Sequence, residues 1–307
     1  MALPGDIDRF IRDYVRAFNA RDLDSVASLY AEDATLEDPV GSTIVRGRPA
    51  IRAFYEQYKD QSSYLHYSGD CRVAQSAIAF SFVACIGTGA DLHVVRIFDS
   101  FRFDDAGKIN EMRAFWGEPD LGGIVEDQAP GAPLLLPLAG RVTLVATGGT
   151  SIGHACARLL ALAGARVVVS GDSESARERL VEELLSVGGQ AIAISGPAQD
   201  APSRAIDLMG RLDHVVNVVT EKDATVRWNG ASQIAASGRS GAIVDIIYSD
   251  PVTIARRPAG NGIRSNALIV DGGHAVSEEA AARVANAALM LFLPQAAAID
   301  GQTLRVI

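Results

Sequence analysis

A segment rich in glycine and proline, at residues 117–138, separates two parts of this chain that differ in the periodicity of their apolar residues. It reads GEPDLGGIVEDQAPGAPLLLPL, and its glycines and prolines interrupt every helical or strand-like pattern. The chain has 307 residues, more than the roughly 100–200 of one usual domain. We therefore predict a first domain at residues 1–120, a linker at 121–138 and a second domain at 139–307.

In the first part, helical spacing of apolar residues precedes strand spacing. Residues 7–18 and 51–58 carry apolar side chains on one helical face, and a shorter helix is predicted around Val26–Tyr30. From Cys71 onward apolar residues recur at every second position, as in strands, and Asp104–Gly107 is typical of a hairpin turn. Helices followed by a meander of strands predict an α+β domain, with a curved sheet wrapped against the helices.

After the linker, short apolar strands alternate with helices. Helices are predicted at 152–163, 175–187 and 278–293. This alternation predicts a parallel, doubly wound α/β sheet of the Rossmann-like kind. The predicted strands are 142–146, 166–170, 191–194, 214–219, 242–247, 262–269 and 302–307.

Composition excludes several classes of partner. The net charge is −9, which argues against nucleic acid as a partner. No apolar run approaches the roughly 20 residues of a membrane span, and the N-terminus lacks the pattern of a secretory signal. Three cysteines without metal-ligand spacing indicate a cytoplasmic protein and no metal site.

Three polar residues of the first part stand in apolar surroundings. Asp38 precedes Pro39 at the end of a predicted strand, and Asp99 lies on the apolar face of another. Such an aspartate is either paired or stays protonated as a hydrogen-bond donor. Tyr14 lies on the apolar face of the first helix. One carboxylate base with two neutral donors suits proton abstraction beside a carbonyl group.

These residues and their surroundings resemble the bacterial Δ5-3-ketosteroid isomerases, within the wider group of cone-shaped folds shared with nuclear transport factor 2 and SnoaL-like proteins. The resemblance covers residues 6–118, and its landmarks include YAEDATLEDPVG, RGRPAIRAFY, FDSFRFDDAGKI and MRAFW. It implies that Asp38 carries the proton between C4 and C6 of a steroid, while Tyr14 and protonated Asp99 bind the oxyanion.

The same resemblance implies further roles. Tyr30 and Tyr55 match tyrosines that hydrogen-bond to the oxyanion-binding tyrosine in part of the family. No cofactor is implied for this reaction, and a homodimer through the first domain is expected. The residues expected to line an apolar steroid pocket are Phe54, Phe82, Phe101, Met112, Ala114 and Trp116.

Two other functions stay open at this point. The domain could be a dehydratase, or an isomerase of another polycyclic enone, because the pocket decides the substrate. It could also be a module that binds steroids or lipids without catalysis, attached to a scaffold domain.

The second part resembles a degenerate, truncated short-chain dehydrogenase. A predicted strand runs into a glycine-rich turn and a helix, with Gly148, Gly149, Ile152 and Gly153 as candidate dinucleotide contacts. The turn is one residue shorter than that of the family. The family's Tyr-x-x-x-Lys pair is missing, since Val252 stands four residues after the only tyrosine of this part, Tyr248. The resemblance therefore implies a non-catalytic domain in which NAD(P) binding is at most vestigial.

Overall fold

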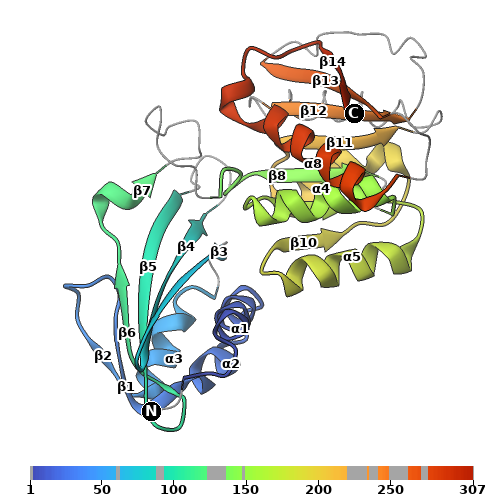
Figure 1. Ribbon diagram of the computed structural model, residues 1–307. Coiled ribbons are helices and arrows are strands. Elements are labelled where there is room, and N and C mark those ends of the chain that lie inside the picture. The colour runs from blue at the N-terminus through green and yellow to red at the C-terminus, as the bar shows by residue number, and fades with distance from the viewer. Residues whose placement is uncertain are drawn as a thin grey trace. The chain divides into compact units, whose positions relative to one another are not determined.

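The computed structural model describes residues 3–59, 63–87, 93–122, 136–146, 149–219, 234, 241–248, 262–270 and 276–306. The chain divides into two compact units. The first comprises Met1–Ala139 with Ser186–Gly188, and the second comprises Gly140–Leu185 with Gly189–Ile307. An antiparallel-rich sheet with three helices forms the first unit, and a parallel sheet with helices forms the second (Figure 1).

Three helices cover one face of the first sheet: α1 (Ile7–Asn19), α2 (Leu23–Ser28) and α3 (Arg48–Glu56). The side chain of Asp6 caps α1 by accepting the Arg9 N–H, which is one of the donors a helix start leaves unpaired. The helix then buries Tyr14 and its apolar neighbours on one face. The third helix begins and ends earlier than the predicted stretch at 51–58. It ends at Glu56, and the N–H of Tyr58 bonds to the carbonyl of Tyr55 in a turn.

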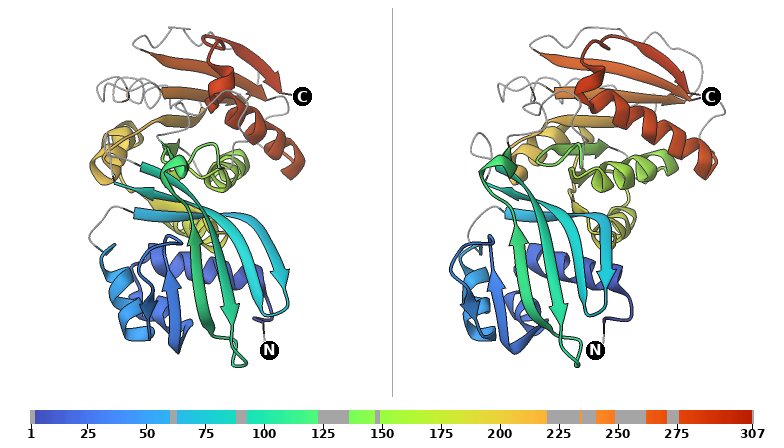
Figure 2. Two further views of the ribbon diagram at one scale, coloured as in Figure 1. Left: turned by 90° about the vertical axis from the view of Figure 1, so that its left-hand side faces the viewer. Right: turned by 60° about the vertical axis from the view of Figure 1, so that its left-hand side comes forward.

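The first sheet curves around these helices (Figure 2). Its order is β2-β1-β6-β5-β4-β3, with β7 beside β5. The β1–β6 pair is parallel and the other pairs are antiparallel. The short strand β7 lies within the segment expected as a linker. The strands are β1 (Tyr30–Glu37), β2 (Val45–Arg46), β3 (Ser63–Ala74), β4 (Ala77–Ile86), β5 (His93–Phe103), β6 (Ile109–Phe115) and β7 (Leu121–Gly122).

Strand β5 shows the alternation that the sequence predicts. The odd-numbered residues from Val95 to Phe103 are all buried, whereas Phe98 and Arg102 on the other face are exposed. Asp104 closes the turn to β6 by accepting the N–H groups of Ala106 and Lys108. Asp99 therefore points to the side of the sheet that the helices cover.

The outer face of this sheet is partly covered by the same chain. Leu136 and Ala139 pack against residues of β3, β4 and β5 there. Phe98 and Phe115, which are register partners on β5 and β6, stay exposed on this face. The expected homodimer through the first domain remains a prediction.

The second sheet is parallel throughout, with the order β10-β9-β8-β11-β12-β13-β14. The first strand in sequence is central, and the order reverses between β8 and β11, as in doubly wound sheets. The strands are β8 (Val142–Ala146), β9 (Arg166–Val169), β10 (Gln190–Ala193), β11 (His214–Val219), β12 (Gly241–Tyr248), β13 (Ile263–Val270) and β14 (Thr303–Val306).

Helices lie on both faces of this second sheet. Helix α6 (Ala201–Met209) packs against Val142, Leu144 and neighbouring side chains of one face. Helices α4 (Ser151–Leu162) and α8 (Glu278–Phe292) pack against each other on the opposite face, and α5 (Glu174–Ser186) follows β9. The parallel α/β sheet predicted from sequence is confirmed. Within the described ranges, no helix is long and apolar enough to cross a membrane.

Candidate active site

The residues expected to abstract a proton and to stabilise the resulting anion come from three separate elements of the first domain. Tyr14 lies on α1, Asp38 directly follows β1, and Asp99 lies in the middle of β5. All three lie in the apolar core between the helices and the sheet, or at the edge of that core. Their environments differ, and this difference decides what each group can do.

Asp99 is a carboxyl group buried without a partner. Its side chain is 1% exposed, and neither of its oxygens has a hydrogen-bond partner among the described residues. Burial, and secondly the charge of Asp38, raise the pKa of Asp99 well above its ordinary value. This shift favours the protonated form of Asp99. A neutral carboxyl group can donate its proton in a hydrogen bond to a ligand oxygen.

Asp38 is half-buried, at the edge of the same core. Its Oδ1 accepts a hydrogen bond of 2.6 Å from the indole N–H of Trp116. Burial raises the pKa of Asp38, and the Trp116 hydrogen bond opposes this shift by favouring the ionised form. Its neighbour Glu37 is turned elsewhere, toward Arg113 and the N–H of Gly41. Asp38 thus has the environment of a carboxylate base held close to a hydrophobic pocket.

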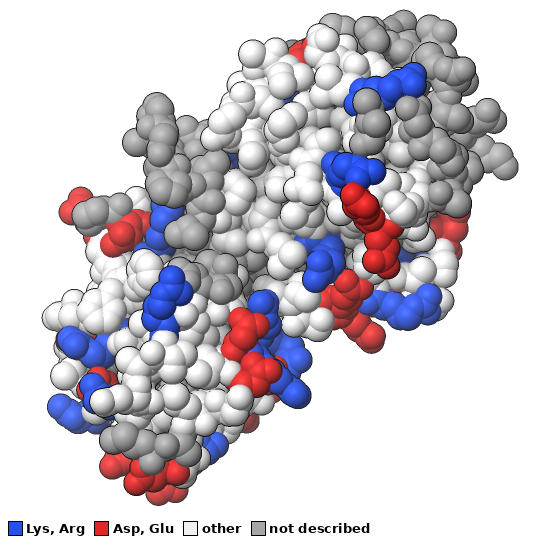
Figure 3. Space-filling model, viewed as in Figure 1, with Lys and Arg blue, Asp and Glu red and all other residues white. Residues whose placement is uncertain are grey.

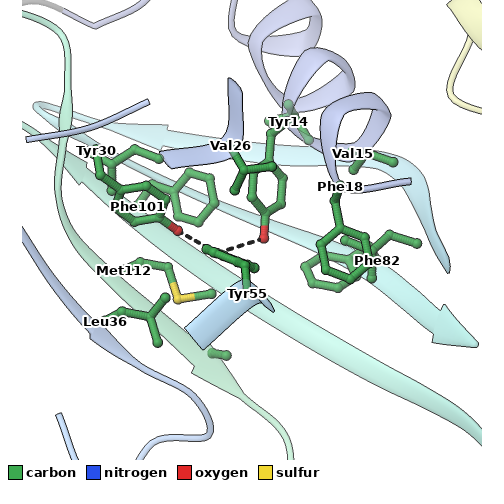
Figure 4. Packing of buried hydrophobic residues seen from close by; sticks show 14 of the residues in the cluster. Tyr14, Val15, Phe18, Val26, Tyr30, Leu36, Tyr55, Phe82, Phe101 and Met112 are labelled. Carbon is green, nitrogen blue, oxygen red and sulfur yellow. Dashed lines mark hydrogen bonds between the residues drawn. The ribbon is translucent and has the colours of Figure 1, made fainter. Parts of the chain in front are cut away.

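Tyr14 is the first member of a buried chain of phenols. Its hydroxyl lies 3.2 Å from that of Tyr55, which lies 2.6 Å from the hydroxyl of Tyr30 (Figure 4). Burial is the largest cause that raises the pKa of Tyr14, and the neighbouring Tyr30 adds to it. The ring of Tyr14 also packs edge-on against Phe101, with centroids 5.4 Å apart. Tyr14 therefore keeps its proton and is held in one orientation.

The six residues expected to line the pocket all belong to this apolar core. Phe82, Phe101, Met112 and Ala114 are buried, and the half-buried Phe54 and Trp116 pack against them. Trp116 does more than line the pocket, because it is the hydrogen-bond donor to Asp38. No local sequence pattern predicts this contact, since the two residues lie far apart along the chain.

Known proteins resemble this part of the chain. The SnoaL-like domain family matches residues 11–112. The steroid Delta-isomerase of Nocardioides simplex is 43% identical over 115 residues, which cover 35% of this chain and 93% of that protein. The chain belongs to the SnoaL-like family. A solved structure of SalBIII, an epoxide hydrolase/cyclase-like enzyme of pyran ring formation in the polyether salinomycin, is 29% identical. The match covers 36% of this chain and 91% of the SalBIII chain, with a TM-score of 0.34.

Outside the SnoaL-like domain, the candidate dinucleotide contacts lie at the start of α4. Gly148 lies outside the described residues. Ile152 and Gly153 are buried, and the N–H of Gly153 already donates to the Thr150 side chain. A phosphate at a helix start needs backbone N–H groups that are free to donate. The N–H of Gly153 is therefore already engaged within the chain.

A groove of about 640 Å³ lies beside this turn, between α4 and α8, and Gly149 is among its lining residues. The groove also contains His154 and Arg158. Both of these side chains are paired with Glu183, at 2.8 Å and 3.4 Å. Glu183 thus already pairs with the Arg158 guanidinium that an anionic ligand would meet here. Across the ranges that the structure describes, no cluster of His, Cys, Asp and Glu could hold a metal ion.

Charged side chains show no strong segregation on the visible surface. On the face of the molecule in Figure 3, lysines and arginines are interspersed with aspartates and glutamates. Several of these are paired along helices, as in Arg12 with Asp8 and Arg283 with Glu279.

Proposed function

We propose that the SnoaL-like domain moves a carbon–carbon double bond of a 3-oxo steroid from the Δ5 to the Δ4 position. Two findings support this substrate and reaction. A relative that is 43% identical is named a steroid Delta-isomerase. Asp38, Tyr14 and Asp99 also lie in one apolar core or at its edge, which suits the roles of one base and two neutral hydrogen-bond donors.

The difference between its two carboxyl groups is the observation that carries the proposal. Asp38 is half-buried and receives a hydrogen bond that favours its charged form. Asp99 is fully buried with no hydrogen-bond partner among the residues that the structure describes, in surroundings that favour its neutral form. Two acids whose environments drive their protonation states apart are suited to separate base and acid roles.

Each step of the reaction follows from these states. The Asp38 carboxylate takes a proton from C4, next to the carbonyl group, and the electron pair of that C–H bond forms a dienolate with its negative charge on O3. Asp38 then returns the same proton to C6, and the conjugated enone results. The proton count is unchanged, and nothing is oxidised or reduced overall.

Tyr14 and Asp99 stabilise the charge that develops on O3. Both are neutral donors in a region from which water is largely excluded, where a hydrogen bond to an anion is strong. Tyr55 holds the hydroxyl of Tyr14 in place, so little reorganisation is needed when the charge forms. Aromatic and aliphatic side chains around them would bind the steroid rings.

Turnover of a Δ5-3-oxo steroid by the full chain, followed as growth of enone absorbance, tests the proposal. Asp38→Asn should lower kcat by at least about 1,000-fold, because the amide cannot accept the proton. Asp33→Asn is the matched control, since Asp33 is an exposed residue of the same strand, and it should retain full activity. Unchanged turnover in Asp38→Asn would contradict the proposal.

We also propose that residues 139–307, after a linker at 121–138, form a degenerate dehydrogenase-like domain of Rossmann-like type without a catalytic role. The strand order of its parallel sheet supports the fold. Tyr248, its only tyrosine, ends β12 as a buried residue and has no lysine four positions later. Calorimetric titration of the full chain with NADH or NADPH should show no binding, and a micromolar dissociation constant would contradict this assignment.

A further inference from the structure

Tyr58 is a fourth tyrosine beside the core of the SnoaL-like domain. It follows α3 and is fixed in a turn by its N–H bond of 3.1 Å to the carbonyl of Tyr55. Its ring packs against Phe54, with centroids 5.8 Å apart, and against Phe18, at 6.3 Å. The ring is thus held in place against a residue expected to line the pocket.

The hydroxyl of Tyr58 differs from the other phenols of this site. Tyr14, Tyr55 and Tyr30 are fully buried and bond to one another. Tyr58 is half-buried, and its hydroxyl has no hydrogen bond to any described residue. Burial, followed by the charge of Asp38, raises the pKa of Tyr58. Its hydroxyl is therefore a neutral group whose hydrogen-bonding capacity no described residue uses.

The exposed fractions of the side chains distinguish a closed end of the site from an open end. Tyr14 and Asp99 are 2% and 1% exposed. Asp38, Phe54 and Tyr58 are all half-buried. A ketone whose oxygen reaches Tyr14 and Asp99 has its reacting carbons near Asp38. The remainder of a rigid polycyclic substrate must then extend toward the open end, where Phe54 and Tyr58 lie.

We infer that Tyr58 is a specificity-determining residue, whose hydroxyl binds an oxygen substituent at the end of the substrate remote from the reacting carbonyl group. The inference rests on the proposed function for the placement of the substrate. In this role Tyr58 favours those 3-oxo steroids that carry a ketone or hydroxyl on the ring farthest from C3. The phenol can donate to either group, and its ring offers an apolar surface beside it.

Equilibrium binding of two reaction products to the full chain tests this inference separately from catalysis. The probes are androst-4-ene-3,17-dione and androst-4-en-3-one, which differ only in the oxygen at C17. Tyr58→Phe removes one hydroxyl and keeps the ring. It should weaken binding of the dione about 3- to 10-fold, as expected for one neutral hydrogen bond, and change binding of the 3-ketone less than about 2-fold.

Tyr64→Phe is the matched control, because Tyr64 packs on the outer face of the sheet. It should leave both dissociation constants unchanged. Equal effects of Tyr58→Phe on the two ligands, no effect on either, or no binding of either ligand by the unaltered chain would overturn the inference. Turnover of the matching Δ5 ketones tests the proposed function independently. An inactive chain that still shows the predicted change in ligand preference would refute only the isomerase activity.

Discussion

Trp116 and Asp38 are joined by a hydrogen bond of 2.6 Å from the indole N–H to the carboxylate, across 78 residues of sequence. The bond contributes to placing the carboxylate at the edge of the apolar core, and it stabilises the charged form that a base needs. Both residues are half-buried, so the interaction is stronger than it would be in water.

Replacement of this tryptophan should shift the pH dependence of catalysis. In Trp116→Phe the carboxylate loses a donor, so the pKa of Asp38 should rise further above its usual value. Because Asp38 acts in its ionised form, the acid limb of the kcat/KM profile should move to higher pH by about one unit. Phe98→Leu, at an exposed site on the outer face, should leave the profile in place. An unshifted acid limb in Trp116→Phe would show that the bond does not tune the base.

Asp99 should make the domain less stable as the pH rises. Its folded-state pKa lies above the unfolded value of about 3.9, so the folded state binds the extra proton. Its favourable contribution is complete below that unfolded pKa and is lost as the pH rises toward the folded pKa. The free energy of unfolding should fall by up to about 1.4 kcal/mol per pH unit in this range.

Asp99→Asn removes this titration while keeping a neutral donor of similar shape. Its unfolding free energy, measured with urea from pH 4 to 8, should depend less steeply on pH than that of the unaltered chain. Activity should fall less in Asp99→Asn than in Asp99→Ala, in which the loss of a donor to the oxyanion should cost about 100- to 1,000-fold in kcat. Parallel pH profiles of stability would contradict a protonated Asp99.

Tyr55 is the central member of the phenol chain, so its loss should affect two hydroxyls together. Tyr55→Phe leaves Tyr14 and Tyr30 buried without their shared partner, and the free energy of unfolding should fall by about 1–3 kcal/mol. Tyr30→Phe leaves the Tyr14–Tyr55 bond intact and should reduce kcat less than Tyr55→Phe. The comparison of kcat and urea midpoints checks this order, and the reverse order would show that Tyr55 does not orient Tyr14.

Asp213 provides a test that the two domains act separately. Its carboxylate accepts hydrogen bonds from Arg211, from Arg141 at 3.1 Å and from the N–H of Val142 at 2.8 Å. Burial alone would raise the pKa of Asp213, but the two guanidinium groups hold it below its ordinary value. Asp213→Ala removes the carboxylate that both buried guanidinium groups contact, and should lower the free energy of unfolding by about 3–5 kcal/mol.

This loss should appear in the unfolding of the second domain alone. Calorimetry of Asp213→Ala should show one transition moved to lower temperature, while isomerase activity at 25 °C is unchanged. Arg283→Ala, which removes an exposed pair with Glu279, is the control and should leave both transitions in place. A parallel loss of isomerase activity in Asp213→Ala would show that the first domain depends on the second.

Local sequence patterns were sufficient to predict the classes of the two sheets and the inward direction of Asp99. Both properties depend on periodicity: alternation along β5 places Asp99 with its apolar neighbours, and strand–helix alternation requires parallel strands. The boundary of α3 was predicted too late. The apolar pattern continues to Tyr58, whereas the backbone leaves the helix after Glu56.

The sequence by itself determined which chemical groups the first domain possesses. They are a carboxylate suited to act as a base, a phenol and a second carboxyl group suited to act as neutral donors, and the apolar residues around them. The tertiary structure decided which of them meet. Tyr14 and Tyr55, 41 residues apart, share a hydrogen bond because α1 and α3 pack on the same sheet. Asp38 meets Trp116 because β1 pairs in parallel with β6. Such contacts depend on strand order and helix packing, which no local periodicity encodes.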